Sequence, residues 1–342
     1  MNRSYFFVRT PIQYYNAIEA KESLPKNAQC FLIILSDYPK TLSQFKELVD
    51  HEMWVSVLMP WKKYGDLTKS KFLNRLLNIT RRLSLNAIFK SIEESDTIFW
   101  GNYNSIWLRY FISKKNNTVS ILDDGFATLS LVSQIQKDKI VFVKNVTTSG
   151  FIDRLLVSRS TSIPIKRLKF FTSFRNISPL INERSTFTEY PFLRKQANQN
   201  FRIEEKMYFI GQPLIRLSLM TKVNYIKNIN RIFDFYKKQG LKCFYIPHRT
   251  SKLDYFPKQW NTINFNFPLE NLIFEENESL PRVIASFYSS ALYFVNKFGQ
   301  NQEINFEYWK ALDLEGNRNI ENCYAYIKKE KSKNTVIHQL DT

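Results

Sequence analysis

An acidic pair stands where a short apolar run of the sequence ends. Asp123 and Asp124 follow the run TVSIL and precede Gly125, which permits a tight turn and close approach of a substrate. A carboxylate at such a position can act as a general base on a substrate hydroxyl. The competing interpretation is that one aspartate caps the next helix and the other is solvated.

A second group of residues has the chemistry to bind a phosphorylated ligand. His248 follows the run KCFYIP and precedes Arg249, a setting that suits a departing phosphate, although a lone strand-end histidine is as often structural. Ser289 and Ser290 offer hydroxyls and backbone N–H groups to phosphate oxygens, although such pairs usually cap a helix or a turn. Glu270 could accept from ribose hydroxyls, or be an ordinary surface residue.

Several common types of site lack their residues. No DxD pattern occurs, which argues against an obligatory metal ion. The other two histidines, His51 and His338, are interpreted as surface residues. GxGxxG, Walker A, HExxH, GxSxG and the kinase motifs are all missing, so dinucleotide, NTPase and hydrolase readings are disfavoured. Three isolated cysteines exclude a disulfide scaffold and suit a reducing compartment.

The elements that must position these residues alternate between short apolar runs and helical stretches. The 342 residues, 44% of them hydrophobic, are enough for two domains with substantial cores. The predicted strands are 4–8, 31–35, 54–58, 97–100, 118–122, 140–143, 207–210, 242–246 and 292–295. Helices are predicted over 12–24, 42–49, 105–111, 224–239, 306–312 and from 281 to 288. This alternation predicts an α/β fold with parallel, doubly wound sheets, whose ligands bind beyond the carboxyl ends of the strands.

The pattern divides the chain into two Rossmann-like domains. Residues 1–162 form the first, and 206–327 the second. Residues 163–205 are irregular and rich in Pro, Ser and Asn, so they are predicted to be a linker; 328–342 read as a polar tail.

The net charge of +18 favours an anionic partner. Basic residues concentrate at 61–90 and 154–175, mixed with Leu and Phe, which is typical of a protein lying on an anionic membrane and equally of a solvated basic helix. Nucleic acid is disfavoured because no zinc-finger, RRM or helix-turn-helix signature occurs. No signal peptide or membrane-spanning run is apparent, so the predicted location is the cytoplasm, with peripheral contact to the inner face of the inner membrane allowed.

Taken together, the motifs resemble those of bacterial sialyltransferases of glycosyltransferase family 52. The resemblance covers most of the chain. It depends on the segments FVRTPIQYYNAIEA, FWGNY, ILDDG, FIGQPL, YIPHR, PLE and FYSSAL, in this order. The family's His-Pro motif is altered here, because proline precedes His248 and arginine follows it.

The resemblance implies a GT-B fold, with two Rossmann-like domains facing across a cleft, and inverting, metal-independent transfer from a CMP-nonulosonate to a glycan or glycolipid. It implies no cofactor. Asp124, or else Asp123, would be the base, and His248 would assist departure of the CMP phosphate. The remaining implied site residues are Gly211, Gln212, Arg249, Glu270, Ser289 and Ser290 for the nucleotide, and Thr10, Gln13 and Asn102 for the donor sugar or acceptor.

Two alternatives remain open. One is a GT-B transferase that uses another nucleotide-activated sugar. The other is a non-catalytic basic protein that binds membrane or nucleic acid. The sequence leaves open a homodimer, the linkage and the identity of the acceptor sugar.

Overall fold

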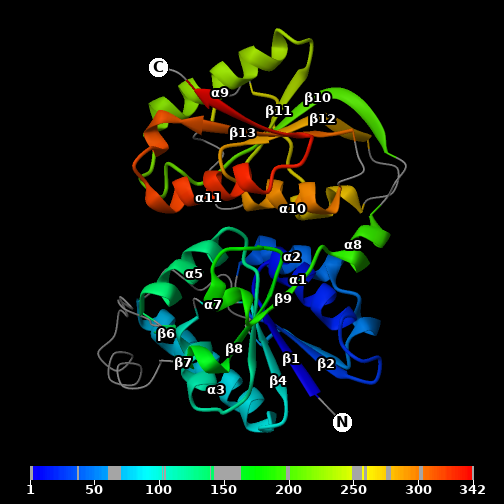
Figure 1. The fold of residues 1–342 in the computed structure, drawn as a ribbon, viewed down its shortest axis with the longest axis vertical. Coiled ribbons are helices and arrows are strands. Elements are labelled where there is room, and N and C mark those ends of the chain that lie inside the picture. The colour runs from blue at the N-terminus through cyan, green and yellow to red at the C-terminus, as the bar shows by residue number, and fades with distance from the viewer. Residues whose placement is uncertain are drawn as a thin grey trace. The chain divides into compact units, whose positions relative to one another are not determined.

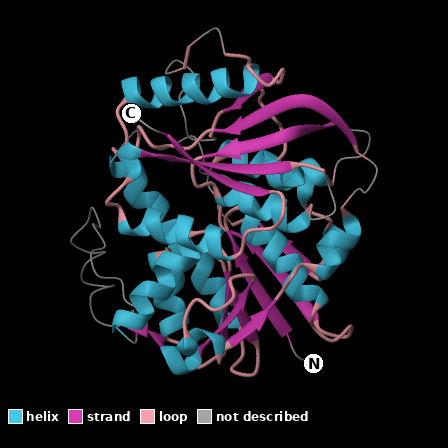
Figure 2. Ribbon diagram, turned by 45° about the horizontal axis from the view of Figure 1, so that its top comes forward, coloured by secondary structure: helices cyan, strands magenta, loops and turns pink. Residues whose placement is uncertain are grey.

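A computed structural model describes residues 3–36, 38–60, 71–101, 103, 105–138, 140–141, 163–197, 201–248, 256–257, 260–274, 279–299 and 303–340. The chain divides into two compact units, Met1–Phe192 (unit 1) and Leu193–Thr342 (unit 2). Each unit contains one parallel sheet (Figures 1 and 2). The predicted α/β class with two parallel-sheet domains is confirmed.

Unit 1 is built on a seven-stranded sheet in the order β3-β2-β1-β4-β5-β8-β9. Every pair of neighbouring strands is parallel. The bounds are β1 Arg3–Val8, β2 Gln29–Ile34, β3 Ser56–Leu58, β4 Thr97–Trp100, β5 Val119–Leu122, β8 Leu168–Thr172 and β9 Ser185–Phe187. Since β1 lies between β2 and β4, the chain reverses its direction across the sheet at this point. Open α/β sheets bind ligands at such a position.

Helices cover both faces of this sheet, because successive side chains of its buried strands point to opposite sides. On one face, Phe7 of β1 packs with Phe89 and Phe111 in the main core cluster. On the other face, Phe6 stacks on Phe99 and meets the edge of Trp54. The helices are α1 Pro11–Glu22, α2 Pro39–Leu48, α3 Lys71–Ser91, α4 Ile106–Ser113, α5 Ala127–Asp138 and α7 Pro179–Asn182, with a 3-10 turn, η1, at His51–Met53.

The predicted linker is wrong for most of its length. Residues 163–187 supply β7 Ile163–Pro164, η3 Ile165–Arg167, β8, α7 and β9, and β8 and β9 complete the sheet of unit 1. β7 pairs antiparallel with β6 Ile140–Val141. The boundary between the units falls instead within α8, Pro191–Gln196. The polar loops between these short elements made the segment resemble a linker, so the buried strand LKFFT of β8 was not predicted.

Unit 2 has a five-stranded parallel sheet in the order β11-β10-β12-β13-β14. Its strands are β10 Arg202–Ile210, β11 Lys242–Ile246, β12 Ser279–Ser286, β13 Asn305–Ala311 and β14 Thr335–Leu340. The long helix α9, Lys222–Lys237, covers one face, and α10 Ser290–Phe298 and α11 Arg318–Lys329 cover the other (Figure 1). Two 3-10 turns, η5 Leu269–Ile273 and η6 Leu312–Leu314, complete the unit. The chain reverses direction at β10, which lies between β11 and β12.

Four predictions for unit 2 are wrong. Residues 281–288 and 306–312 were expected to be helical, yet they lie largely in strands β12 and β13. Residues 292–295, expected to be a strand, lie inside helix α10. The expected polar tail contains the end of α11 and the whole of β14, which pairs with β13. The β14 strand therefore forms an edge of the sheet where the sequence suggested a polar tail.

The two basic segments have different structures. The described part of the first, 71–90, lies in α3, a helix on the surface of unit 1. The described part of the second, 163–175, is strand β8 and its flanks, with Phe170 and Phe171 buried, so it does not form a surface helix. Among the described helices, none is long and apolar enough to cross a membrane.

Candidate functional site

The carboxyl edge of the unit 1 sheet gathers polar groups from three neighbouring strands. The turn after β1 carries Arg9 and Thr10, Gly101 follows β4, and Asp123 and Asp124 follow β5. β1 pairs with β4, and β4 with β5, all in parallel, so the three ends meet at one edge. The predicted acidic pair therefore lies beside the point where the strand order reverses.

Asp123 is buried, with 1% of its surface exposed. Its carboxylate accepts hydrogen bonds from the Thr172 hydroxyl (2.7 Å), the Ser173 backbone N–H (2.8 Å) and the Ser173 hydroxyl (3.2 Å). Burial raises its pKa from 3.8 to about 7, against the opposing effect of these hydrogen bonds. Asp123 thus ties the end of β5 to the end of β8. It is not the solvated residue of the competing interpretation.

Asp124 is half-buried and one residue further from the strand. Its carboxylate accepts a hydrogen bond from the Thr10 hydroxyl (3.4 Å), and its backbone N–H donates to the Thr128 hydroxyl (3.0 Å). Gly125 follows with a φ of +62°, a left-handed conformation that glycine adopts without strain. This turn leads directly into α5. Of the two carboxylates, Asp124 is the one with access to a substrate.

Gln13 packs against Gly101, the residue after β4, next to this turn. The Gln13 side chain is buried and accepts a hydrogen bond from the Arg9 backbone N–H (2.7 Å). A Cβ on Gly101 would lie 3.0 Å from Cβ of Gln13, so glycine lets the two segments pack. Gln13 therefore shapes the turn after β1. Asn102, the other predicted residue here, lies outside the described residues.

Sequence reasoning missed the groups that hold this turn in place. Tyr103 is 3% exposed, and its pKa is raised by burial and by the negative charge of Asp124. Asn16 donates to the Asp123 carbonyl oxygen (3.4 Å) and accepts from the Tyr190 hydroxyl (2.8 Å). The motif FWGNY contained a signal for Tyr103, whereas nothing in the sequence marks Tyr190.

In unit 2 the carboxyl edge begins with Gly211, which follows β10. Its backbone N–H donates to the Ile246 carbonyl oxygen at the end of β11 (2.8 Å). A Cβ at this position would overlap the Tyr245 hydroxyl and lie 2.6 Å from Tyr245 Cζ. That hydroxyl is fixed by a hydrogen bond with the Tyr225 hydroxyl (2.9 Å). Close packing of strand ends, rather than a positive φ, is what requires glycine here.

We expect Gly211→Ala to lower the free energy of unfolding by about 1–3 kcal/mol, because the added methyl must displace a hydrogen-bonded tyrosine. Denaturant unfolding followed by circular dichroism measures this loss. Gly316→Ala is the control: its Cβ meets nothing within 4 Å, and only its φ of +75° is unfavourable, at about 1 kcal/mol. A Gly211→Ala protein as stable as the wild type would show that Tyr245 moves aside freely.

Gln212 connects the ends of β10 and β12. Its side-chain oxygen accepts hydrogen bonds from the Tyr288 backbone N–H (2.9 Å) and the Ser286 hydroxyl (3.4 Å). Its own backbone N–H donates to the Tyr225 hydroxyl (3.2 Å). Because these bonds engage Gln212 with neighbouring residues of unit 2, it holds the ends of β10 and β12 together.

The serine pair stands at the start of helix α10, just after β12. Ser289 is the residue before the first helical turn, is 8% exposed, and does not cap the helix with its side chain. Ser290 is the first helical residue. The first N–H groups of a helix point outward and favour an anion. The sequence predicted a strand here, and the observed helix gives the serines a better phosphate-binding setting. Glu270 lies on η5, which packs against α10.

His248 comes two residues after β11 and is half-buried at the same edge. Arg249 lies outside the described residues. His338 corrects the prediction of a surface histidine: its ring stacks on Trp309 with centroids 4.2 Å apart, and Nε2 lies 2.5 Å from the Glu307 carboxylate. The Tyr236 hydroxyl also donates to Glu307 (2.6 Å). His338 therefore contacts a carboxylate within the sheet instead of lying free on the surface.

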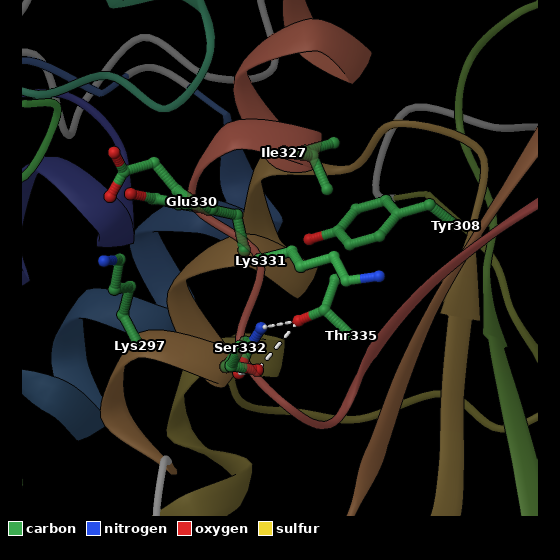
Figure 3. Close-up of a pocket in the computed structure, with 9 residues that line it drawn as sticks. Lys297, Tyr308, Ile327, Glu330, Lys331, Ser332 and Thr335 are labelled. Atoms are coloured by element: carbon green, nitrogen blue, oxygen red, sulfur yellow. Dashed lines mark hydrogen bonds between the residues drawn. The ribbon is translucent and has the colours of Figure 1, made fainter. Parts of the chain in front are cut away.

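A separate small pocket of unit 2, about 20 Å³, lies away from this edge (Figure 3). Its lining comes from α10, from Tyr308 of β13, from the end of α11 with the residues that follow it, and from the start of β14. The Thr335 hydroxyl accepts from Asn296 (2.9 Å) and shares a hydrogen bond with Ser332 (2.9 Å). Since β14 begins here, the pocket is at the opposite end of the strands from His248.

The arrangement can perform acid–base chemistry in unit 1 and bind an anion in unit 2. Asp124 offers an accessible carboxylate, while the start of α10 offers N–H groups and hydroxyls near the ends of β10, β11 and β12. No grouping of three or more His, Cys, Asp or Glu residues suited to a metal ion occurs in the described part of the chain.

No curated protein matches the sequence. Crystal structures with similar folds include Arabidopsis thaliana UGT89C1 complexed with UDP (TM-score 0.47, 9% identity, 99% of this chain and 86% of that one). They also include Neisseria meningitidis UDP-GlcNAc 2-epimerase bound to UDP-GlcNAc (0.46, 10%, 85% and 79%) and the spinosyn forosaminyltransferase SpnP (0.45, 12%, 100% and 86%). These likenesses are too weak to inform the site.

The comparison with family models, by contrast, shows the family of the chain. The model of Glycosyltransferase family 52 matches residues 30–306, which is most of the chain and includes both the acidic pair and the serine pair. The chain belongs to glycosyltransferase family 52 and is a glycosyltransferase.

Proposed function

We propose that this glycosyltransferase moves sialic acid, or a related nonulosonate, from its CMP donor to a terminal sugar, galactose, of a bacterial surface glycan. The observation that carries the proposal is the accessible Asp124 carboxylate at the edge of the unit 1 sheet, in a chain of family 52. Transfer proceeds with inversion and without a metal ion.

The chemistry of the donor explains which groups are needed. The anomeric carbon of a nonulosonate is tertiary and carboxylated, so its bond to CMP ionises readily and the transition state resembles an oxocarbenium ion. Such a reaction needs a base on the acceptor hydroxyl, stabilisation of the leaving phosphate, and correct positioning. It needs no protein nucleophile.

Each need has a proposed residue. Asp124 removes the proton from the acceptor hydroxyl, and Asp123 holds the turn that carries Asp124. His248 and Arg249 stabilise the departing phosphate, which Ser289, Ser290 and the start of α10 bind. Glu270 takes the ribose hydroxyls, Gly211 allows the nucleotide to approach the backbone, and Gln212 orders the edge. Thr10, Gln13 and Asn102 border the donor sugar or acceptor.

The proposed setting is the cytoplasm, at the inner face of the inner membrane. A glycolipid acceptor would be presented there, and the charge of +18 favours contact with anionic lipid. Nucleic acid is not a proposed partner, and a homodimer is compatible with the proposal.

The test is release of CMP from CMP-Neu5Ac with a panel of galactosides, in the presence of EDTA. We expect turnover to persist in EDTA and to fall by about 10²-fold or more in His248→Ala, because the leaving phosphate loses a stabilising donor. His51→Ala, which changes an exposed histidine of unit 1, is the control and should retain full turnover. Turnover that requires a divalent cation, or no CMP release with any acceptor, would contradict the proposal.

A further inference from the structure

The surface of unit 1 carries a groove of about 460 Å³ between α3 and α4, and neither residue of the acidic pair lines it. Four cations line it, and none of its described lining residues is acidic. These cations are Arg82, Lys90, Lys114 and Lys115. The groove therefore presents concentrated positive charge to whatever occupies it.

Two of these cations lie over the same aromatic ring. The Arg82 guanidinium lies 6.0 Å from the centre of the Tyr110 ring, and the Lys114 ammonium 5.7 Å from the same centre. The Lys115 ammonium donates to the Ile92 carbonyl oxygen (2.6 Å), which fixes it in the turn after α4. Positive charges gathered around one ring repel each other, and an anion placed among them relieves this repulsion.

Apolar side chains accompany these charges. Ile79 and Leu83 lie one helical turn apart on α3 and are 54% and 60% exposed. Beneath them, Phe89 and Phe111 are buried and stacked, with ring centroids 5.2 Å apart. A solvated basic helix has no need of exposed Ile and Leu. Aliphatic side chains that protrude beside lysines are typical of a helix that lies in a membrane interface.

The choice between lipid and nucleic acid follows from which side chains are exposed. Proteins that bind single strands expose aromatic rings on which bases stack. Of the three aromatic residues that line the groove, Phe89 and Phe111 are buried, and Tyr110 is half-buried with Arg82 and Lys114 over its ring, whereas the exposed apolar residues are aliphatic.

We propose that the α3–α4 groove docks unit 1 on the surface of an anionic phospholipid bilayer. Lys90, Lys114 and Arg82 contact the headgroup phosphates, while Ile79 and Leu83 enter the boundary between headgroups and acyl chains. The groove is then the surface that makes the membrane contact of the proposed function. The proposal rests on that function only to explain why membrane contact is useful.

The test is co-sedimentation of the full chain with phosphatidylcholine vesicles, with or without about one third phosphatidylglycerol. We expect binding only to the anionic vesicles, weakened by salt. Lys90→Ala/Lys114→Ala should reduce affinity by roughly 10- to 30-fold, and Ile79→Ser/Leu83→Ser should also reduce it. The matched controls are Lys40→Ala/Lys46→Ala on α2, which removes the same charge, and Val223→Ser on α9, which removes another exposed aliphatic group.

The outcomes separate this inference from the proposed function. Equal losses in the groove pair and in the α2 pair would show that net charge alone attracts the bilayer, and would overturn the inference. So would binding that the groove variants leave unchanged, or tighter binding to single-stranded RNA at the same groove. CMP release on a water-soluble galactoside should stay intact in the groove variants. Vesicle binding by a protein that releases no CMP would refute the proposed function and leave the groove assignment standing.

Discussion

Asp124→Asn is expected to lower the rate of transfer by about 10²- to 10⁴-fold, because the amide cannot accept the proton of the acceptor hydroxyl. The substitution keeps the size of the side chain and an oxygen for the Thr10 hydroxyl. Thermal stability should therefore change little. Binding of CMP should also be retained, since its proposed contacts lie in unit 2. Initial rates of CMP release at saturating donor, with calorimetric CMP binding beside them, measure both quantities.

The matched control is Glu47→Gln, which removes one exposed carboxylate from α2 of the same unit. It should transfer at the wild-type rate. If Asp124→Asn also retained the wild-type rate, the base would have to be another group. If it lost CMP binding together with transfer, the carboxylate would act on the donor instead of the acceptor.

Asp123→Ala is expected to cost about 2–4 kcal/mol of unfolding free energy. The substitution leaves the Ser173 backbone N–H and two hydroxyls at the end of β8 without their acceptor, and all of them are buried. Asp123→Asn keeps an acceptor oxygen and should be much milder. Denaturant titration at pH 7 compares the two. An alanine variant as stable as the asparagine variant would mean that the strand ends are held by other contacts.

The raised pKa of Asp123 also predicts how stability depends on pH. The folded state holds a proton up to about pH 7, whereas the unfolded chain releases it near pH 3.8. Between these values the folded state binds more protons, so the contribution of Asp123 to stability is greatest at low pH and decreases as pH rises through that window. The decrease amounts to a few kcal/mol at most. In Asp123→Asn this component should vanish, which paired unfolding curves across the window would reveal.

The sequence predicted unit 1 better than unit 2 for a physical reason. The strands of β1, β2, β4 and β5 are short apolar runs bounded by turn residues, and each lies buried in a parallel sheet. The positions of Asp123 and Asp124 after β5 followed from this pattern. The pattern of apolar runs does not indicate that Asp123 is buried while Asp124 is half-buried. The partners of Asp123 come from β8, about 50 residues later.

In unit 2, two predicted helices proved to be strands and one predicted strand proved to be a helix, because short apolar runs look alike in either conformation. Pro281 was expected to begin a helix, yet it lies in β12 where the pairing with β10 is irregular. Glu307 lies within the other expected helix, yet its carboxylate is paired inside the sheet with His338 and Tyr236. In both cases, contacts with residues distant in sequence determined the strand conformation, and a local sequence pattern does not indicate such contacts.

The bond between Asn16 and Tyr190 spans 174 residues, and both ends belong to unit 1. The surroundings of the acidic pair are thus completed only when the last part of that unit has been synthesised. A nascent chain that has just passed β5 already has the first strands of the sheet, but it lacks β8, Ser173 and Tyr190. Since distant contacts form late, the turn carrying Asp124 acquires its final geometry at the end of the folding of unit 1. A ribosome-bound chain truncated between β5 and β8 would have its two aspartates and no transferase-competent arrangement of them.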